Sequence, residues 1–186
     1  MMVLTEEENK LTMEDVINEE TKNYFIEISK RMIPELREYF IEKYDLEEDI
    51  KNPICIFSLY SSDSNRALGM TYMHSKKTHD VIKYKVDKTI VIFLSNIFLN
   101  LKNNKYVTDD MFKNLSLYTL IHEATHWFQC ESGLYTGIEE NLDGYNEREL
   151  MCHKDVHEFI NNLKGSEYKL LKIFDEIIYH TETIKK

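Results

Sequence analysis

Hydrophobic positions recur every three or four residues in the first quarter of the chain, a spacing typical of amphipathic helices. We predict helices over residues 13–28 and 32–44, with a break near Pro34 because proline disrupts a helix interior. The first dozen residues are acidic and polar, so a frayed end is expected there. Asn52 and Pro53 then end the helical part.

The pattern next changes to short β-type runs separated by polar segments. The four runs cover residues 54–60, 68–73, 81–86 and 89–94. The third alternates, with Lys83 and Lys85 on its polar face, whereas the fourth is apolar on both faces. These patterns predict a partly exposed strand and a central strand in a small, mainly antiparallel sheet.

Helical spacing returns in the last third of the chain. Thr108 is an N-cap residue for a long helix that runs to about Glu131, and Gly133 is its stop signal. This helix has few polar positions, so it should be buried on most sides. A second helix begins at Asn146, and a final amphipathic helix covers residues 170–178.

These elements predict an α+β fold in a single domain over residues 1–186. Within it we expect a frayed segment, N-terminal helices, a sheet, two central helices and a C-terminal helix. The corresponding ranges are 1–12, 13–50, 54–95, 108–164 and 166–180.

Composition excludes several classes of protein. The formal net charge of -10 and a pI near 5.2 disfavour nucleic-acid and anionic-membrane partners, which need a basic surface. Three cysteines without CxxC spacing indicate free thiols rather than a disulfide framework or a thiolate zinc site. With no export signal and no apolar run of about 20 residues, we expect a cytoplasmic protein.

The charge is unevenly distributed along the chain. From Lys51 to Thr108 there are nine Lys or Arg residues against three Asp and no Glu, a local net charge of +6. Acidic helices around strands that contain little Glu would produce this difference. Alternatively, the basic segment borders a site for an acidic partner.

The strongest motif lies inside the long helix, where residues 122–126 read His-Glu-Ala-Thr-His. Four residues are slightly more than one helical turn, so His122 and His126 project from one face and can share a metal ion, with Glu123 beside them. Two histidines that are satisfied only by hydrogen bonds in the core are the structural alternative. A metal would supply the polar partner that these buried imidazoles need.

A catalytic zinc site needs a third protein ligand, and the helix after Asn146 offers three candidates. At 100° per residue, Glu149 lies on the apolar side of this helix, whereas Glu147 points the opposite way. Glu149 is therefore preferred over Glu147 and His153. Residues 146–149 also resemble a capping box, in which the Glu149 side chain would only accept a hydrogen bond from the backbone amide of Asn146.

The HExxH motif, followed after 22 residues by Glu149 and three positions later by Cys152, resembles the zincin metallopeptidases of the gluzincin type. The order of sheet, motif helix and ligand helix is similar over roughly 110 residues. Small intracellular peptidases of bacteria and phages are similar in size. This family usually has Ala or Ser at the position of Cys152, and the metzincin pattern is absent.

The resemblance implies a zincin-like fold and one Zn²⁺ ion held by His122, His126 and Glu149. It implies that Glu123 is the general base for hydrolysis of a peptide or protein substrate. The substrate would extend along an edge strand, residues 68–73 or 81–86, and the basic segment there favours an acidic peptide. Candidate oxyanion donors are Tyr135, Tyr145, His153 and His180. The alternative is a catalytically silent protein of the same fold that acts as a binding or regulatory module.

Overall fold

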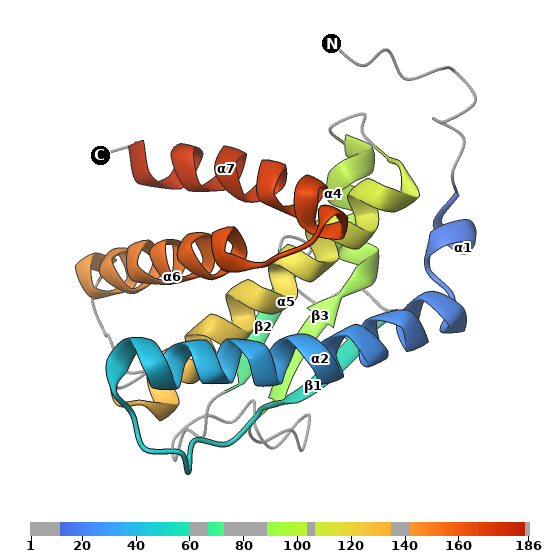
Figure 1. The fold of residues 1–186 in the computed structure, drawn as a ribbon. Helices are drawn as coiled ribbons and strands as arrows, with labels where there is room; N and C mark the ends of the chain where they lie inside the picture. The colour runs from blue at the N-terminus through green and yellow to red at the C-terminus, as the bar shows by residue number, and fades with distance from the viewer. Residues whose placement is uncertain (1–11, 60–66, 73–88, 104–106, 135–141, 185–186) are drawn as a thin grey trace.

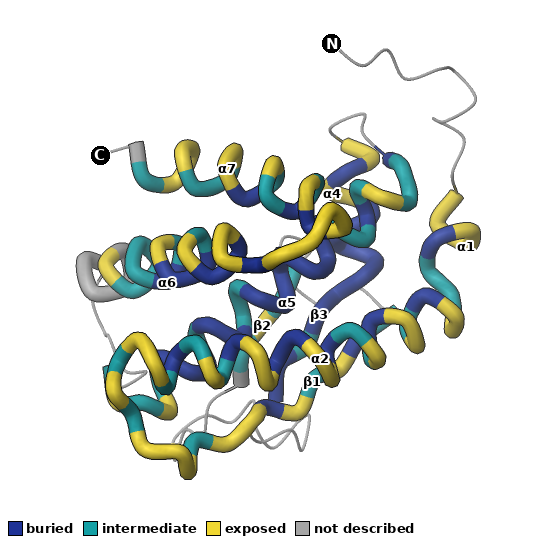
Figure 2. Tube along the Cα trace, viewed as in Figure 1, coloured by how far each residue is buried: buried dark blue, intermediate teal, exposed yellow. Residues whose placement is uncertain are grey.

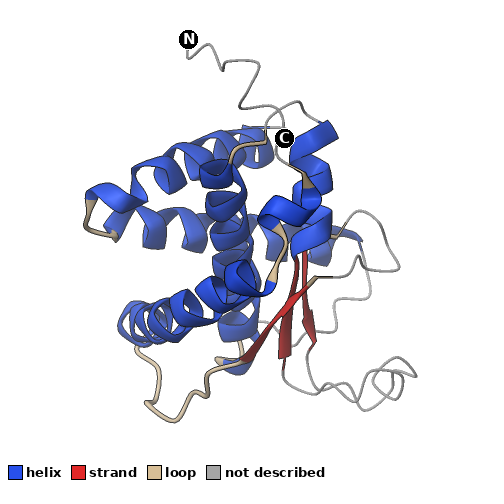
Figure 3. Cartoon of the chain, turned by 90° about the vertical axis from the view of Figure 1, so that its right-hand side faces the viewer, coloured by secondary structure: helices blue, strands red, loops and turns tan. Residues whose placement is uncertain are grey.

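A long helix, α5 (Asp109–Glu131), is the centre of the fold (Figure 1). The computed structural model describes residues 12–59, 67–72, 89–103, 107–134 and 142–184. In these residues α5 contacts β2 and β3 of a small sheet as well as helices α2, α4, α6 and α7. Figure 3 shows the three strands together on one side of the helices. The described chain is therefore α+β, as the sequence predicts.

The sheet is mixed rather than mainly antiparallel. Its strands are β1 (Ile54–Ser58), β2 (Gly69–Tyr72) and β3 (Thr89–Phe93), in the order β1-β3-β2. β2 pairs antiparallel with β3, but β1 pairs parallel with β3, with Ile54 opposite Thr89. The antiparallel expectation is thus wrong for β1, because β1 joins the far side of β3 instead of forming a hairpin with β2. The predicted strand over residues 81–86 lies outside the described residues.

The N-terminal helices divide at a different place from the one predicted. A short helix, α1 (Met13–Val16), ends before Asn18, which caps α2 (Glu19–Tyr44). α2 continues through Pro34 without a break. Pro34 lies on the exposed side, whereas the flanking Met32, Ile33 and Leu36 are buried in the core. The packing of this apolar face outweighs the hydrogen bond that proline cannot form.

Helix α4 (Leu94–Asn103) follows β3 directly and was not predicted. Its two first polar residues have tertiary partners: Ser95 donates to the carbonyl of Leu59, and Asn96 Nδ2 donates to the carbonyl of Ala67 at 2.6 Å. The long helix, in contrast, has the predicted ends. Thr108 caps α5, and Gly133 adopts a left-handed φ of 73° just after it.

The last two long helices, α6 (Leu142–Asn162) and α7 (Lys169–Ile184), pack on α5 and on each other. A short 3-10 turn, η2 (Ser166–Tyr168), separates them. Both helices are longer than predicted, because α6 begins four residues before Asn146 and α7 extends beyond residue 178. Burial is greatest along α5 and β3, and the outward face of α7 is exposed (Figure 2).

A buried carboxylate joins three of these helices. Asp155 of α6 accepts hydrogen bonds from Lys43 Nζ at 2.9 Å and Tyr44 Oη at 2.7 Å, both at the end of α2. It also accepts one from Gln129 Nε2 of α5 at 2.8 Å. The relative position of α2, α5 and α6 is therefore fixed by polar as well as apolar contacts. No described helix has the length and apolar character that crossing a membrane requires.

Candidate metal centre

The two histidines of the motif lie on one face of α5, as their spacing predicts. The Nε2 atoms of His122 and His126 are 3.2 Å apart, and the ring planes are perpendicular. Their helix is otherwise almost fully buried, with Ala124, Thr125 and Trp127 in the core. Two ligand-type nitrogens therefore meet at one point beside the interior of the protein.

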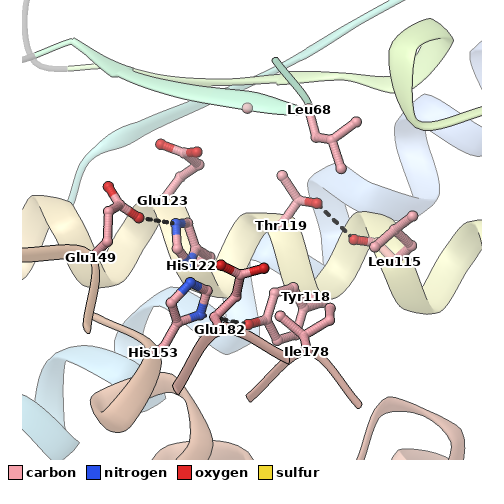
Figure 4. Close-up of a pocket in the computed structure, with 11 residues that line it drawn as sticks. Leu68, Leu115, Tyr118, Thr119, His122, Glu123, Glu149, His153, Ile178 and Glu182 are labelled. Carbon is pink, nitrogen blue, oxygen red and sulfur yellow. Dashed lines mark hydrogen bonds and ion pairs between the residues drawn. The ribbon is translucent and has the colours of Figure 1, made fainter. Parts of the chain in front are cut away.

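Helix α6 brings Glu149 to the same point (Figure 4). Glu149 Oε2 lies 3.4 Å from His122 Nε2, and Glu149 Oε1 lies 3.2 Å from His126 Nε2. Because α6 begins at Leu142, Asn146 is inside the helix and cannot be its N-cap, so the capping-box alternative does not apply. Glu147 is exposed, in keeping with its predicted direction.

These distances fit a tetrahedral metal ion. Two ligand atoms that are each 2.0–2.1 Å from a zinc ion at a tetrahedral angle are about 3.3 Å apart. The Nε2 atoms of His122 and His126 are 3.2 Å apart, and the two carboxylate oxygens of Glu149 lie 3.4 Å from His122 Nε2 and 3.2 Å from His126 Nε2. Two imidazole nitrogens and a carboxylate are also a common donor set for zinc. The described residues thus have the composition and spacing of a three-ligand site.

Two more potential ligands border this group. Cys152 is fully buried, and its Sγ lies 3.5 Å from His122 Nδ1 but 4.0 Å from His122 Nε2. The thiol also donates to the carbonyl of His122. His153 has a ring nitrogen within 4.8 Å of ligand atoms of His122 and Glu149. Cys152 Sγ therefore lies within 4.8 Å of ligand atoms of both His122 and His126, which makes Cys152 a second candidate for the third ligand.

The local charges favour a cation at the histidine nitrogens. Burial opposes the charged form of His126, but Cys152 and Glu149 outweigh it and raise its pKa to about 9. Burial would raise the pKa of Glu149, yet its hydrogen bonds to His122 and His126 hold it well below the usual range. The same negative surroundings that stabilise a proton on these rings would stabilise a metal cation.

Glu123 lies beside His122, His126 and Glu149, on the side that faces the sheet. Its Oε2 accepts a hydrogen bond of 2.7 Å from the hydroxyl of Thr71 on β2. Gly69, on the same strand, approaches so closely that an added Cβ would lie 2.6 Å from Glu123 Cγ. β2 is therefore in direct contact with the residue that the motif predicts as general base.

A pocket of about 290 Å³ opens beside these groups. His122, Glu123, Glu149 and His153 line it together with Ile178 and Glu182 of α7 (Figure 4). The remaining wall is mostly apolar and includes Leu68, Gly69, Leu115, Tyr118 and Thr119. The cluster is thus accessible to a substrate from one side.

No protein-family model, curated protein or solved structure matches this chain. The chemistry of the site therefore rests on its own groups: three convergent ligand atoms, an adjacent carboxylate and a pocket. All four residues predicted from the motif and its downstream helix, His122, Glu123, His126 and Glu149, lie in this one place.

Of the four candidate oxyanion donors, His153 is the one that lines the pocket in the described residues. His180 is exposed and pairs with Glu176 at 3.2 Å. Tyr135 lies outside the described residues, and Tyr145 is on α6 without a described side chain. His153 Nδ1 lies 3.2 Å from Tyr118 Oη, and burial lowers the pKa of His153 to about 4. His153 is therefore neutral at pH 7.

Several residues at the site were not predicted from the sequence. Thr71, which bonds Glu123, and Glu182, which lines the pocket, carry no pattern that places them near the motif. Gly69 does have a signal, because an isolated glycine within a strand often marks a close approach of backbone to another group. The basic residues of the segment predicted to border the substrate lie, apart from Lys51 and Lys102, outside the described residues.

Proposed function

We propose that this protein is a zinc-dependent metallopeptidase of the zincin type. The observation that carries the proposal is the convergence of His122, His126 and Glu149 donor atoms at 3.2 to 3.4 Å, with Glu123 adjacent and a pocket in front. A purely structural metal site does not require a carboxylate that lies beside its ligands without being one of them. A hydrolase needs one as its general base.

In this mechanism His122, His126 and Glu149 hold the zinc ion. Bound there, zinc would polarise the peptide carbonyl and lower the pKa of a coordinated water toward about 7. Glu123 takes the proton of the attacking water on its carboxylate and returns it to the leaving amine. Its place between the histidines and β2 puts it on the side from which the pocket opens.

His153 is the donor that we assign to the developing oxyanion. Burial raises the pKa of Tyr118, so the phenol stays protonated and can donate to His153 Nδ1. The other ring nitrogen then carries the hydrogen, in a neutral ring that faces the pocket. Removing such a donor typically lowers kcat by about 10²–10³.

A peptide is the proposed substrate. β2 is at one edge of the described sheet and its Gly69 lines the pocket, which supports a substrate extended along residues 68–73; the other candidate strand, 81–86, lies outside the described residues. The preference for acidic peptides stays a prediction from sequence. Three carboxylates line the described pocket, from Glu123, Glu149 and Glu182, and these groups would not favour acidic side chains of a substrate.

The test is the Glu123→Gln variant with two readouts. Zinc content after dialysis, measured by elemental analysis, should be one ion per chain in both wild type and variant. Cleavage of a mixed peptide library, followed by mass spectrometry, should fall by about 10²–10⁴ in the variant. Wild-type protein that binds zinc without cleaving any peptide would favour the silent binding module, and a chain without stoichiometric zinc would overturn both readings.

A further inference from the structure

Strand β2 meets helix α5 at the predicted general base. Side chains alternate along the strand, so Gly69 and Thr71 face α5, whereas Met70 points away and is 39% exposed. The two facing residues contact the same partner: Thr71 by hydrogen bonds and Gly69 by close approach to Glu123. Two strand positions therefore converge on one carboxylate.

The hydroxyl of Thr71 lies between two oxygens of Glu123. Its Oγ1 is 2.7 Å from Oε2 of the side chain and 2.8 Å from the backbone carbonyl oxygen. A hydroxyl has a single hydrogen, so it donates to one of these oxygens at a time or is shared between them. The carbonyl of Glu123 lies within a helix and already accepts a hydrogen bond from the next turn. The charged carboxylate is the stronger acceptor, so the hydroxyl donates preferentially to it.

Gly69 closes the opposite side of the same carboxylate. A Cβ at this position would lie 2.6 Å from Glu123 Cγ and 3.0 Å from Oε1, and 2.9 Å from Thr119 Cγ2. The first two contacts would displace Glu123 from its present place. The absence of a side chain at Gly69 and the hydroxyl of Thr71 thus act together on the carboxylate's position.

We propose that Thr71 is a positioning residue that holds Glu123 for proton transfer. This inference rests on the proposed peptidase function and extends it to a residue outside the HExxH motif. By holding Oε2, Thr71 leaves Oε1 as the oxygen that receives the proton of the attacking water.

The same hydroxyl can serve both stages of the reaction. Before proton transfer, it donates to the ionised carboxylate. Once Oε1 carries the proton, Oε2 is the carbonyl-type oxygen of the carboxylic acid and can still accept from the same hydroxyl. Glu123 therefore keeps a hydrogen-bond partner while it holds the proton and while it does not, without movement of the backbone.

The test compares Thr71→Val, which removes the hydroxyl at nearly constant shape, with Thr71→Ser, which retains it. We expect kcat to fall about 10- to 100-fold in the valine variant with KM changed less than threefold, and to recover within threefold of wild type in the serine variant. Thr181→Val is the matched control, because its hydroxyl is exposed on α7 and donates to the carbonyl of Ile177 in its own helix.

Zinc content and the thermal midpoint are measured on every variant. If the valine variant does not fold, Thr71→Ala against Thr71→Ser makes the same comparison. A valine variant that keeps wild-type kcat, or a serine variant as slow as the valine one, would overturn the role of Thr71 while an active wild type leaves the peptidase proposal intact. An inactive, zinc-loaded wild type would overturn both.

Discussion

Replacing Glu149 with alanine tests whether this carboxylate is the third metal ligand. Four-ligand structural zinc sites gain about 10–16 kcal/mol from the metal, or about 3–4 kcal/mol for each ligand. Glu149 contacts both histidine nitrogens, at 3.4 and 3.2 Å, and its removal also withdraws the negative charge that stabilises a cation there. We therefore expect zinc affinity to weaken by about 3 kcal/mol or more, which is about 100-fold.

Glu147→Ala is the matched control, because it removes the same group from an exposed position two residues away on the same helix. Zinc affinity is measured by competition with a chromophoric chelator, and the control should remain within threefold of wild type. A Glu149→Ala variant with wild-type affinity would refute the assignment. Cobalt substitution provides a second readout. A sulfur-to-cobalt absorption band would identify Cys152, which lies near both histidines, as a ligand, and its absence is expected if Glu149 is the third ligand.

Two buried aspartates should respond in opposite ways to neutral substitution. Asp155→Ala removes three hydrogen bonds that join α2, α5 and α6, so we expect the free energy of unfolding in urea to fall by about 3–5 kcal/mol, and a loss below about 1 kcal/mol would contradict this. Burial raises the pKa of Asp175, whose titratable neighbours are His157 and Glu176, so its ionisation opposes folding. The stability that protonated Asp175 contributes is fully present below the unfolded pKa of about 3.9 and is lost as pH rises through the raised pKa, so Asp175→Asn should gain stability relative to wild type as pH rises above about 4. Parallel stability profiles for the two proteins would argue against this.

The elements that could be predicted from sequence are those with local signals. Thr108 and Gly133 mark the ends of α5 because capping and left-handed geometry depend on the residues at the helix ends themselves. The strand positions were similarly visible from short apolar runs between polar segments. Four residues of the candidate centre followed from helical spacing, since a turn of helix fixes which side chains share a face.

Features that depend on distant contacts could not be predicted in this way. α4 begins at Leu94, inside the apolar run that predicts a strand over residues 89–94, so this run conceals the start of the helix. The continuation of α2 through Pro34 depends on the core beneath it. The contact of Thr71 with Glu123 joins residues 52 positions apart, and no local pattern specifies it.

The parallel pairing of β1 with β3 has a consequence for how the protein folds. Ile54 pairs with Thr89, 35 positions later in the chain, and β2 pairs with that same β3 and packs against α5. Closing such a loop costs chain entropy before its contacts compensate, so this sheet should assemble more slowly than the helices around it. Local opening of β2 would then release Glu123 from Thr71 while α5 and α6 still hold His122, His126 and Glu149 together. In that state the candidate metal ligands would stay together while Glu123 loses its position beside them.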